Sequence, residues 1–174
     1  MYKRQGDALL DSYHAERHPA AARALRMTMA MIGLMGQGDH VEALRETVAD
    51  LVVLDEPRRR LGGLLSGLDV HYDLGDGHPL LGRRMPDLDL ETADGVVRCS
   101  SLLHDGHAVL VDLAGGLGAP GVRIVDSTYD GAWELPVLGA VPAPSAVLVR
   151  PDGYVAWAGD GGDAGLADAL ARWC

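Results

Sequence analysis

The first seventy residues carry apolar positions with the spacing of helices. Asp7 can cap a first helix that begins with Leu9, Leu10 and Tyr13. We expect Pro19 to kink or restart this helix, because proline lacks the N–H of a helix interior. Further on, apolar residues recur three and four positions apart, as on one helix face. This stripe comprises Ala22, Leu25, Met29 and Ile32.

Two more helices are predicted after the Gly36-Gln37-Gly38 break. Asp39, with Glu42 three residues later, resembles a capping box. The acids and proline of Asp55-Glu56-Pro57 are typical of a first helical turn. Two apolar stripes follow these starts: Val41, Leu44, Val48 and Leu51, then Leu61, Leu64, Leu65 and Leu68.

From residue 74 the pattern changes to short apolar runs between Gly and Pro. Residues 74–85 indicate an irregular connector, and Ser100–His104 a short helix. Asp163 can cap a last helix with Leu166, Leu170 and Trp173 on one face. The strand-like runs are Leu88–Leu90, Val96–Val97, Ala108–Leu113, Val122–Val125, Ala146–Val149 and Tyr154–Ala158, the last two joined by a Pro151-Asp152-Gly153 turn. We therefore expect an α/β fold with about three helices in 1–73 and a second domain in 74–174.

Composition and charge narrow the class of protein. The chain has 174 residues, 48% hydrophobic and 23% charged, and a formal charge of -10, which is typical of a globular domain. An acidic chain argues against nucleic acid as a partner, and no apolar run is long enough for a membrane span. Cys99 and Cys174 form no C-x-x-C motif, so a reducing cytoplasm is expected. Residues 1–5 contain the only lysine, Lys3, and differ in composition from the rest, so we expect the natural protein to extend further upstream.

One glycine motif has the residue spacing of a dinucleotide fingerprint but not the predicted secondary structure around it. Gly116-Leu117-Gly118-Ala119-Pro120-Gly121 follows an apolar run, as G-x-G-x-x-G should. The fingerprint needs a helix at this point, whose N-terminus faces the pyrophosphate. The strand-like run Val122–Val125 follows at once, so we interpret the motif as a glycine-rich turn.

The other candidate motifs lack a partner or the right spacing. His14 and His18 share a helix face but have no third ligand, and Ser145 is not flanked by the glycines of a nucleophile elbow. Gly159–Asp163 lacks the closing glutamate of a calcium loop. The residues alone therefore assign no catalytic, cofactor-binding or metal-binding role.

The second part resembles a thioredoxin-like domain, in βαβ/ββα order. The segments that carry the resemblance are Met85–Leu90 with Asp94–Val97, His107–Leu113 as the central strand, Pro144 at the position of the cis-proline, and Val149–Trp157 as the last hairpin. That fold's redox chemistry needs a thiolate after the central strand. The segment 114–119 has no cysteine, so we expect a redox-inactive domain.

The helical part and the connector carry a second resemblance. Leu9–Pro19, Leu64–Tyr72 and His78–Asp87 are similar to segments of class A flavoprotein aromatic hydroxylases of the polyketide branch. These are FAD- and NAD(P)H-dependent monooxygenases that end in a thioredoxin-like domain without the cysteines. The family's FAD-binding motifs and substrate domain come before the Leu9–Pro19 segment and are missing from this sequence.

The resemblance implies the C-terminal part of such a hydroxylase, which is not catalytic by itself. FAD and NAD(P)H are then cofactors of the parent protein and are not expected on this chain alone. The expected partners are the FAD and substrate domains. Without them the helices should expose apolar residues and favour self-association; we expect these to be Leu10, Tyr13, Leu25, Met29 and Ile32. The alternative is a free-standing, redox-inactive thioredoxin-like binding or scaffold module, and a thiol-redox role ranks third.

Overall fold

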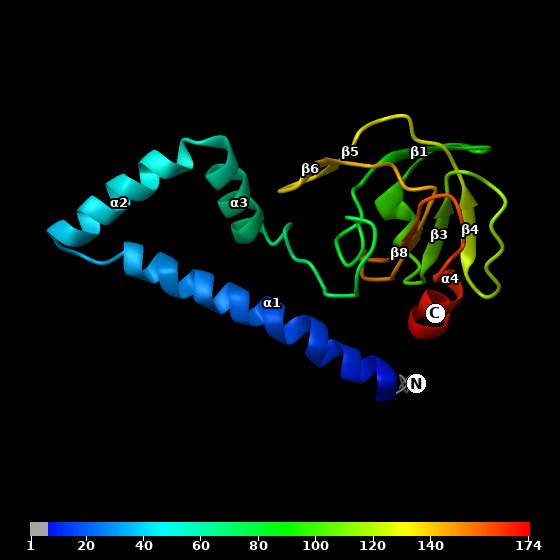
Figure 1. The fold of residues 1–174 in the computed structure, drawn as a ribbon, viewed down its shortest axis with the longest axis horizontal. Coiled ribbons are helices and arrows are strands. Elements are labelled where there is room, and N and C mark those ends of the chain that lie inside the picture. Colours follow the sequence, from blue (N-terminus) through cyan, green and yellow to red (C-terminus); the bar gives the residue numbers. More distant parts are fainter. Residues whose placement is uncertain (1–6) are drawn as a thin grey trace. The chain divides into compact units, whose positions relative to one another are not determined.

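Three helices form the first part of the chain, as the periodicity predicts. The computed structural model describes residues 7–174, with side chains from residue 12 onward, so segment 1–5 and the side chains of Asp7 and Leu10 lie outside it. The helices are α1 (Asp7–Leu34), α2 (Asp39–Val52) and α3 (Asp55–Ser66) (Figure 1). A helical unit ends at Val70 and a β-rich unit spans His71–Cys174, whereas the sequence placed this boundary after residue 73.

Local signals in the helical unit were partly misread. α1 continues through Pro19 without a restart. Only the carbonyl of Ala15 loses its helical partner there, and Ala15 and Pro19 are both exposed, so water can reach it. The predicted capping box at Asp39 is also wrong. Gly38 is the N-cap, no side chain caps α2, and Asp39 adds a negative charge to the first turn instead.

Eight short strands and one helix build the β-rich unit. The strands are β1 (Asp89–Thr92), β2 (Gly95–Arg98), β3 (Val109–Asp112), β4 (Arg123–Asp126), β5 (Trp133–Leu135), β6 (Gly139–Val141), β7 (Ala146–Val149) and β8 (Val155–Gly159). A 3₁₀ turn, η1 (Cys99–Leu103), follows β2, and α4 (Leu166–Trp173) ends the chain. The predicted α/β class, the short helix near Ser100 and the final hairpin are confirmed, while β5 and β6 were missed.

The central sheet has the strand order β4-β3-β7-β8. β3 and β4 are parallel, and β7 is antiparallel to both β3 and β8. The predicted ββα end is therefore β7-β8-α4. The βαβ part differs, because residues 113–122 join the two parallel strands without a helix. No cis peptide bond occurs in the described residues, so the expected cis-proline at Pro144 is wrong. Gly165, not Asp163, is the N-cap of α4.

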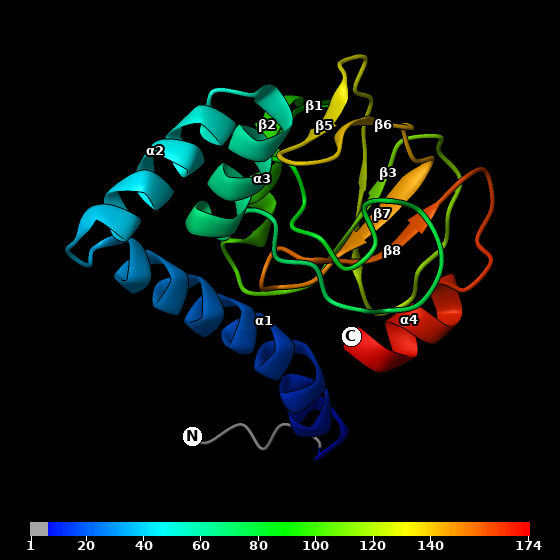
Figure 2. The same cartoon turned by 60° about the vertical axis from the view of Figure 1, so that its left-hand side comes forward.

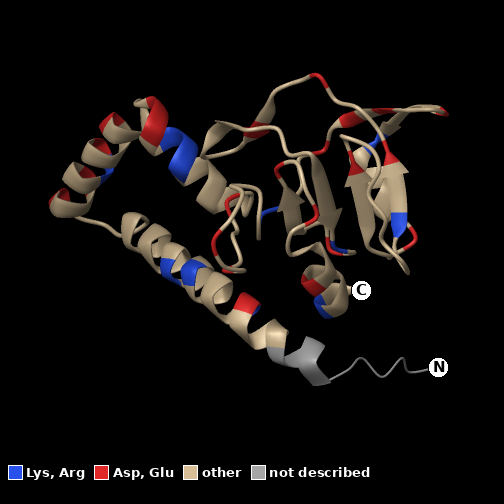
Figure 3. Cartoon of the chain, turned by 45° about the vertical axis from the view of Figure 1, so that its right-hand side comes forward, with Lys and Arg blue, Asp and Glu red and all other residues tan. Residues whose placement is uncertain are grey.

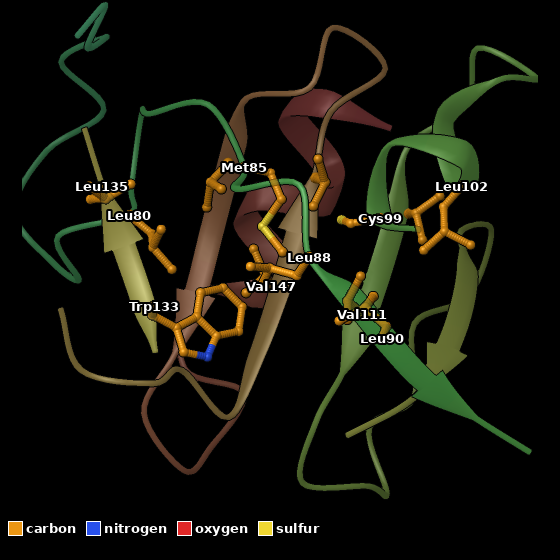
Figure 4. Packing of buried hydrophobic residues seen from close by; sticks show 13 residues of the cluster. Leu80, Met85, Leu88, Leu90, Cys99, Leu102, Val111, Trp133, Leu135 and Val147 are labelled. Atoms are coloured by element: carbon orange, nitrogen blue, oxygen red, sulfur yellow. The ribbon is translucent and has the colours of Figure 1, made fainter. Parts of the chain in front are cut away.

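Alternating side chains of the central sheet pack on its two faces, as strand geometry requires. On one face Val109, Val111 and Val147 join residues from β1, η1 and β5, among them Cys99 and Trp133 (Figure 4). On the other face Leu110, Leu148 and Trp157 pack with Leu166 of α4. Figure 2 shows α4 beside the end of the central sheet that carries β8. The β-rich unit thus has a closed apolar core of its own.

Candidate functional site

The helical unit, in contrast, has almost no core. Among residues 12–70, Val41 is the only apolar side chain that is buried. A contact of 3.4 Å between the Arg23 guanidinium and the Asp69 carboxylate joins α1 to the segment after α3, but it is exposed and contributes little. A unit of this size cannot offset its chain entropy without buried apolar surface. The helical unit therefore leaves most of its large apolar side chains exposed.

Helix α1 presents apolar residues on two opposite sides. Ala20, Met27 and Leu34 follow one another every seven residues and are half-buried, so they mark the inner side. At 100° per residue, the set Leu25, Met29 and Ile32 falls on the opposite side. These three side chains are exposed, Ile32 to 62%. We call Leu25, Met29 and Ile32 the outer stripe; it confirms the exposure predicted for these residues.

Charged residues are absent from the C-terminal end of α1, which carries Met29 and Ile32 of the outer stripe. After Arg26 the helix has no charged residue, and the end of α1 that leads to α2 is entirely tan in Figure 3. Met31 and Met35 add exposed thioether side chains at this end of the helix. A helix that is apolar on both sides is typically buried on both sides, and flexible methionines suit a docking surface. The outer stripe is therefore the strongest candidate interaction surface of the helical unit.

The glycine motif at Gly116–Gly121 does not fit a dinucleotide. It lies in the loop between β3 and β4, where no helix begins. The buried Asp112 carboxylate already accepts the N–H groups of Ala114, Gly115 and Leu117. These donors are the ones that a pyrophosphate at the end of β3 would need. The motif is therefore a turn, as the sequence predicts, and not a dinucleotide fingerprint.

The remaining motif residues have structural contacts. The Ser145 hydroxyl accepts a hydrogen bond of 2.8 Å from the Gly161 N–H, which ties β7 to the loop after β8. The rings of His14 and His18 lie 5.0 Å apart on exposed α1 positions. The described residues contain no group of three or more His, Cys, Asp and Glu side chains that could hold a metal ion. Among the described helices, none has the length and apolarity needed to span a membrane.

The two thiols occupy opposite environments. Cys99 is buried at the start of η1, and burial, with a smaller effect of the Asp87 charge, raises the pKa of its thiol to about 11. Cys174 is exposed, and neither cysteine forms a disulfide. A thiol with a raised pKa is a poor nucleophile at neutral pH. The segment Leu113–Leu117 after the central strand carries no sulfur.

Comparison with known proteins gives the class. Residues 78–174 match the family model "Aromatic-ring hydroxylase, C-terminal", and the chain belongs to this family. This confirms the resemblance carried by the connector segment.

Several proteins that the chain resembles are monooxygenases or hydroxylases. The chain is 42% identical over 173 residues to anhydrotetracycline monooxygenase of Streptomyces rimosus. The aligned region covers 95% of this chain and 34% of that protein. The chain is 41% identical over 155 residues to rifampicin monooxygenase of Streptomyces venezuelae, covering 88% and 30%. The crystal structure of CabE, an aromatic hydroxylase from angucycline biosynthesis, superposes with a TM-score of 0.84 at 41% identity, over 98% of this chain and 36% of that one. The chain thus spans about a third of the length of the relatives that it matches.

Proposed function

We propose that this chain acts as the C-terminal part of an FAD- and NAD(P)H-dependent aromatic-ring hydroxylase and contributes no catalytic group of its own. The observation that carries the proposal is a helical unit without a core, joined to a closed β-rich unit of the hydroxylase family. Relatives of the family are about three times as long as the region that this chain matches. We assign FAD, NAD(P)H and the aromatic substrate to that additional length.

The proposed partner of the outer stripe is the FAD- and substrate-binding part of such a hydroxylase. A second copy of the chain could bury the same apolar face, but a dimer leaves the additional length of the relatives without a role. The free-standing scaffold alternative predicts a helical unit that is stable by itself. Val41 is the only buried apolar side chain among residues 12–70, so burial of apolar surface contributes little to the stability of that unit. Docking on a larger domain supplies the missing burial, at about 25 cal/mol per Å² of apolar surface.

A chimera tests this proposal. This chain replaces the matching third of anhydrotetracycline monooxygenase, to which it is 42% identical. We expect the chimera to retain bound flavin and NAD(P)H-dependent hydroxylation. Ile32→Glu in the chimera should lower both, because a carboxylate would be buried in the interface.

The matched control is Val96→Glu. Val96 is also β-branched and is 69% exposed, but it belongs to β2 of the β-rich unit and not to the outer stripe. Val96→Glu should leave flavin content and activity close to those of the parent chimera. Equal losses for the two variants, or no loss for Ile32→Glu, would refute docking through the outer stripe. For the isolated chain, light scattering should show self-association that Ile32→Glu reduces.

A further inference from the structure

The end of β3 carries a buried carboxylate that turns back onto its own loop. Asp112 is 1% exposed. One of its carboxylate oxygens, Oδ1, accepts hydrogen bonds from the N–H groups of Ala114 at 3.2 Å and Gly115 at 2.8 Å. The other, Oδ2, accepts from the Leu117 N–H at 2.9 Å. Three backbone donors of one short loop thus converge on one carboxylate.

The backbone of this loop has the shape of an anion site. Gly115 and Gly116 have φ angles of +79° and +96°, a region that favours glycine. Turned backbone of this kind directs nearby N–H groups to one side, which makes a concave site for an anion. The Ser145 carbonyl accepts the N–H groups of Leu113 and Ala114 from outside, so the loop is also held on the sheet.

A hollow of about 460 Å³ adjoins the carboxylate. Its wall includes Asp112 with Ala114, and also Ser127 and two further carboxylates, those of Glu91 and Asp126. The Ser127 hydroxyl is buried and has no hydrogen-bond partner among the described residues. The site therefore has room beside the carboxylate and one further donor that is not used.

We propose that residues 113–117 form an anion-binding loop whose resident ligand is the Asp112 carboxylate. If that side chain is removed, the loop should take a small monocarboxylate such as formate from solution. The physical reason is that loss of the carboxylate leaves the Gly115 and Leu117 N–H groups without their protein acceptor, whereas the Ala114 N–H keeps its bond to the Ser145 carbonyl. A planar anion with two oxygens can restore the acceptors, one oxygen to each side of the loop. The loop that replaces a crossover helix would then be a binding site that the chain fills itself.

Asp112→Ala with formate tests the proposal, and Asp126→Ala is the matched control. Asp126 is the register partner of Asp112, lines the same hollow and carries the same charge, but it is exposed. Urea unfolding of the full chain would be followed by tryptophan fluorescence, in sodium formate and in sodium chloride of equal ionic strength. We expect the unfolding midpoint of Asp112→Ala to fall well below those of the natural chain and Asp126→Ala. Formate, compared with chloride, should recover most of this loss with a saturable dependence on concentration.

Several outcomes would overturn the inference. One is that formate shifts the midpoints of Asp112→Ala and Asp126→Ala equally, which would be a general salt effect. Another is that inorganic phosphate recovers as much as formate does, which would refute the planar carboxylate class. If Asp112→Ala does not fold in chloride, refolding into formate must still recover soluble protein, and failure there refutes the site. Asp112→Asn, which keeps the side-chain volume, should show no recovery in formate.

Discussion

The Cys99 thiol offers a quantitative test of the expectation that the β-rich unit is redox-inactive. Its side chain is 3% exposed in the apolar cluster on one face of the central sheet. Burial disfavours the thiolate and, with the nearby Asp87 charge, raises the pKa from an ordinary value of 9.0 to about 11. Folding therefore keeps this thiol protonated in alkaline solutions where the unfolded chain would ionise it.

The size and the sign of the effect follow from proton linkage. Two pKa units correspond to a free energy of about 3 kcal/mol, taken as an order of magnitude. Because the folded pKa is raised, the contribution of Cys99 is fully present below pH 9. It is lost as the pH rises through about 11. The natural chain should thus lose stability in this window by about 3 kcal/mol more than Cys99→Ala does.

Tryptophan fluorescence is a suitable probe, because Trp133, Trp157 and Trp173 all lie in the β-rich unit. Urea unfolding would be measured at several pH values from 7.5 to 11 for the natural chain and for Cys99→Ala. Cys174→Ala, which removes the exposed thiol, should behave as the natural chain does. Parallel pH profiles for Cys99→Ala and the natural chain would refute the reasoning, as would rapid alkylation of Cys99 in the folded protein at pH 7.

Two further predictions concern single positions. Gly82→Ala should destabilise the β-rich unit by about 3 kcal/mol or more, because φ is +70° and the new Cβ would lie 1.9 Å from a backbone oxygen. Gly106→Ala, with φ of +73° but open space around it, should cost only about 1–2 kcal/mol in the same urea experiment, and equal costs would refute the predicted clash. Dilute hydrogen peroxide should oxidise the exposed Met29 and Met35 of the isolated chain well before the buried Met85, measured by peptide mass spectrometry. In the chimera Met29 should become protected, and an unchanged oxidation rate there would argue against docking.

Much of the fold could be predicted from local pattern. The three helices follow from apolar residues at helical spacing. The β7–β8 hairpin follows from two apolar runs joined by Pro151-Asp152-Gly153, residue types that favour a tight turn. β5 and β6 were missed because each strand, Trp133–Leu135 and Gly139–Val141, has only three residues, too few for an alternating pattern to be recognised, although the two pair as a local hairpin. The course of α1 through Pro19 and the cap at Gly38 were misjudged because a local preference was overruled by the rest of the helix.

Of the two candidate sites, one could be predicted from the sequence and the other could not. The outer stripe could be predicted, since Leu25, Met29 and Ile32 have helical spacing and the resemblance supplied a reason for their exposure. The role of Asp112 could not, because Asp at a strand end gives no sign of which N–H groups it accepts. A hint was available in the run of glycines after β3, which permits a sharply turned loop. Only the three-dimensional structure showed that Asp112 closes this loop onto itself.

Flavin titration of the purified chain asks whether these residues bind FAD by themselves; we propose that they do not. FAD fluorescence and protein-bound absorbance would be followed as the chain is added, with anhydrotetracycline monooxygenase as a control in the same assay. We expect no saturable change for this chain and no oxidation of NADPH or NADH when it is present with FAD. Stoichiometric, saturable FAD binding by this chain alone would show that the flavin site lies within these residues.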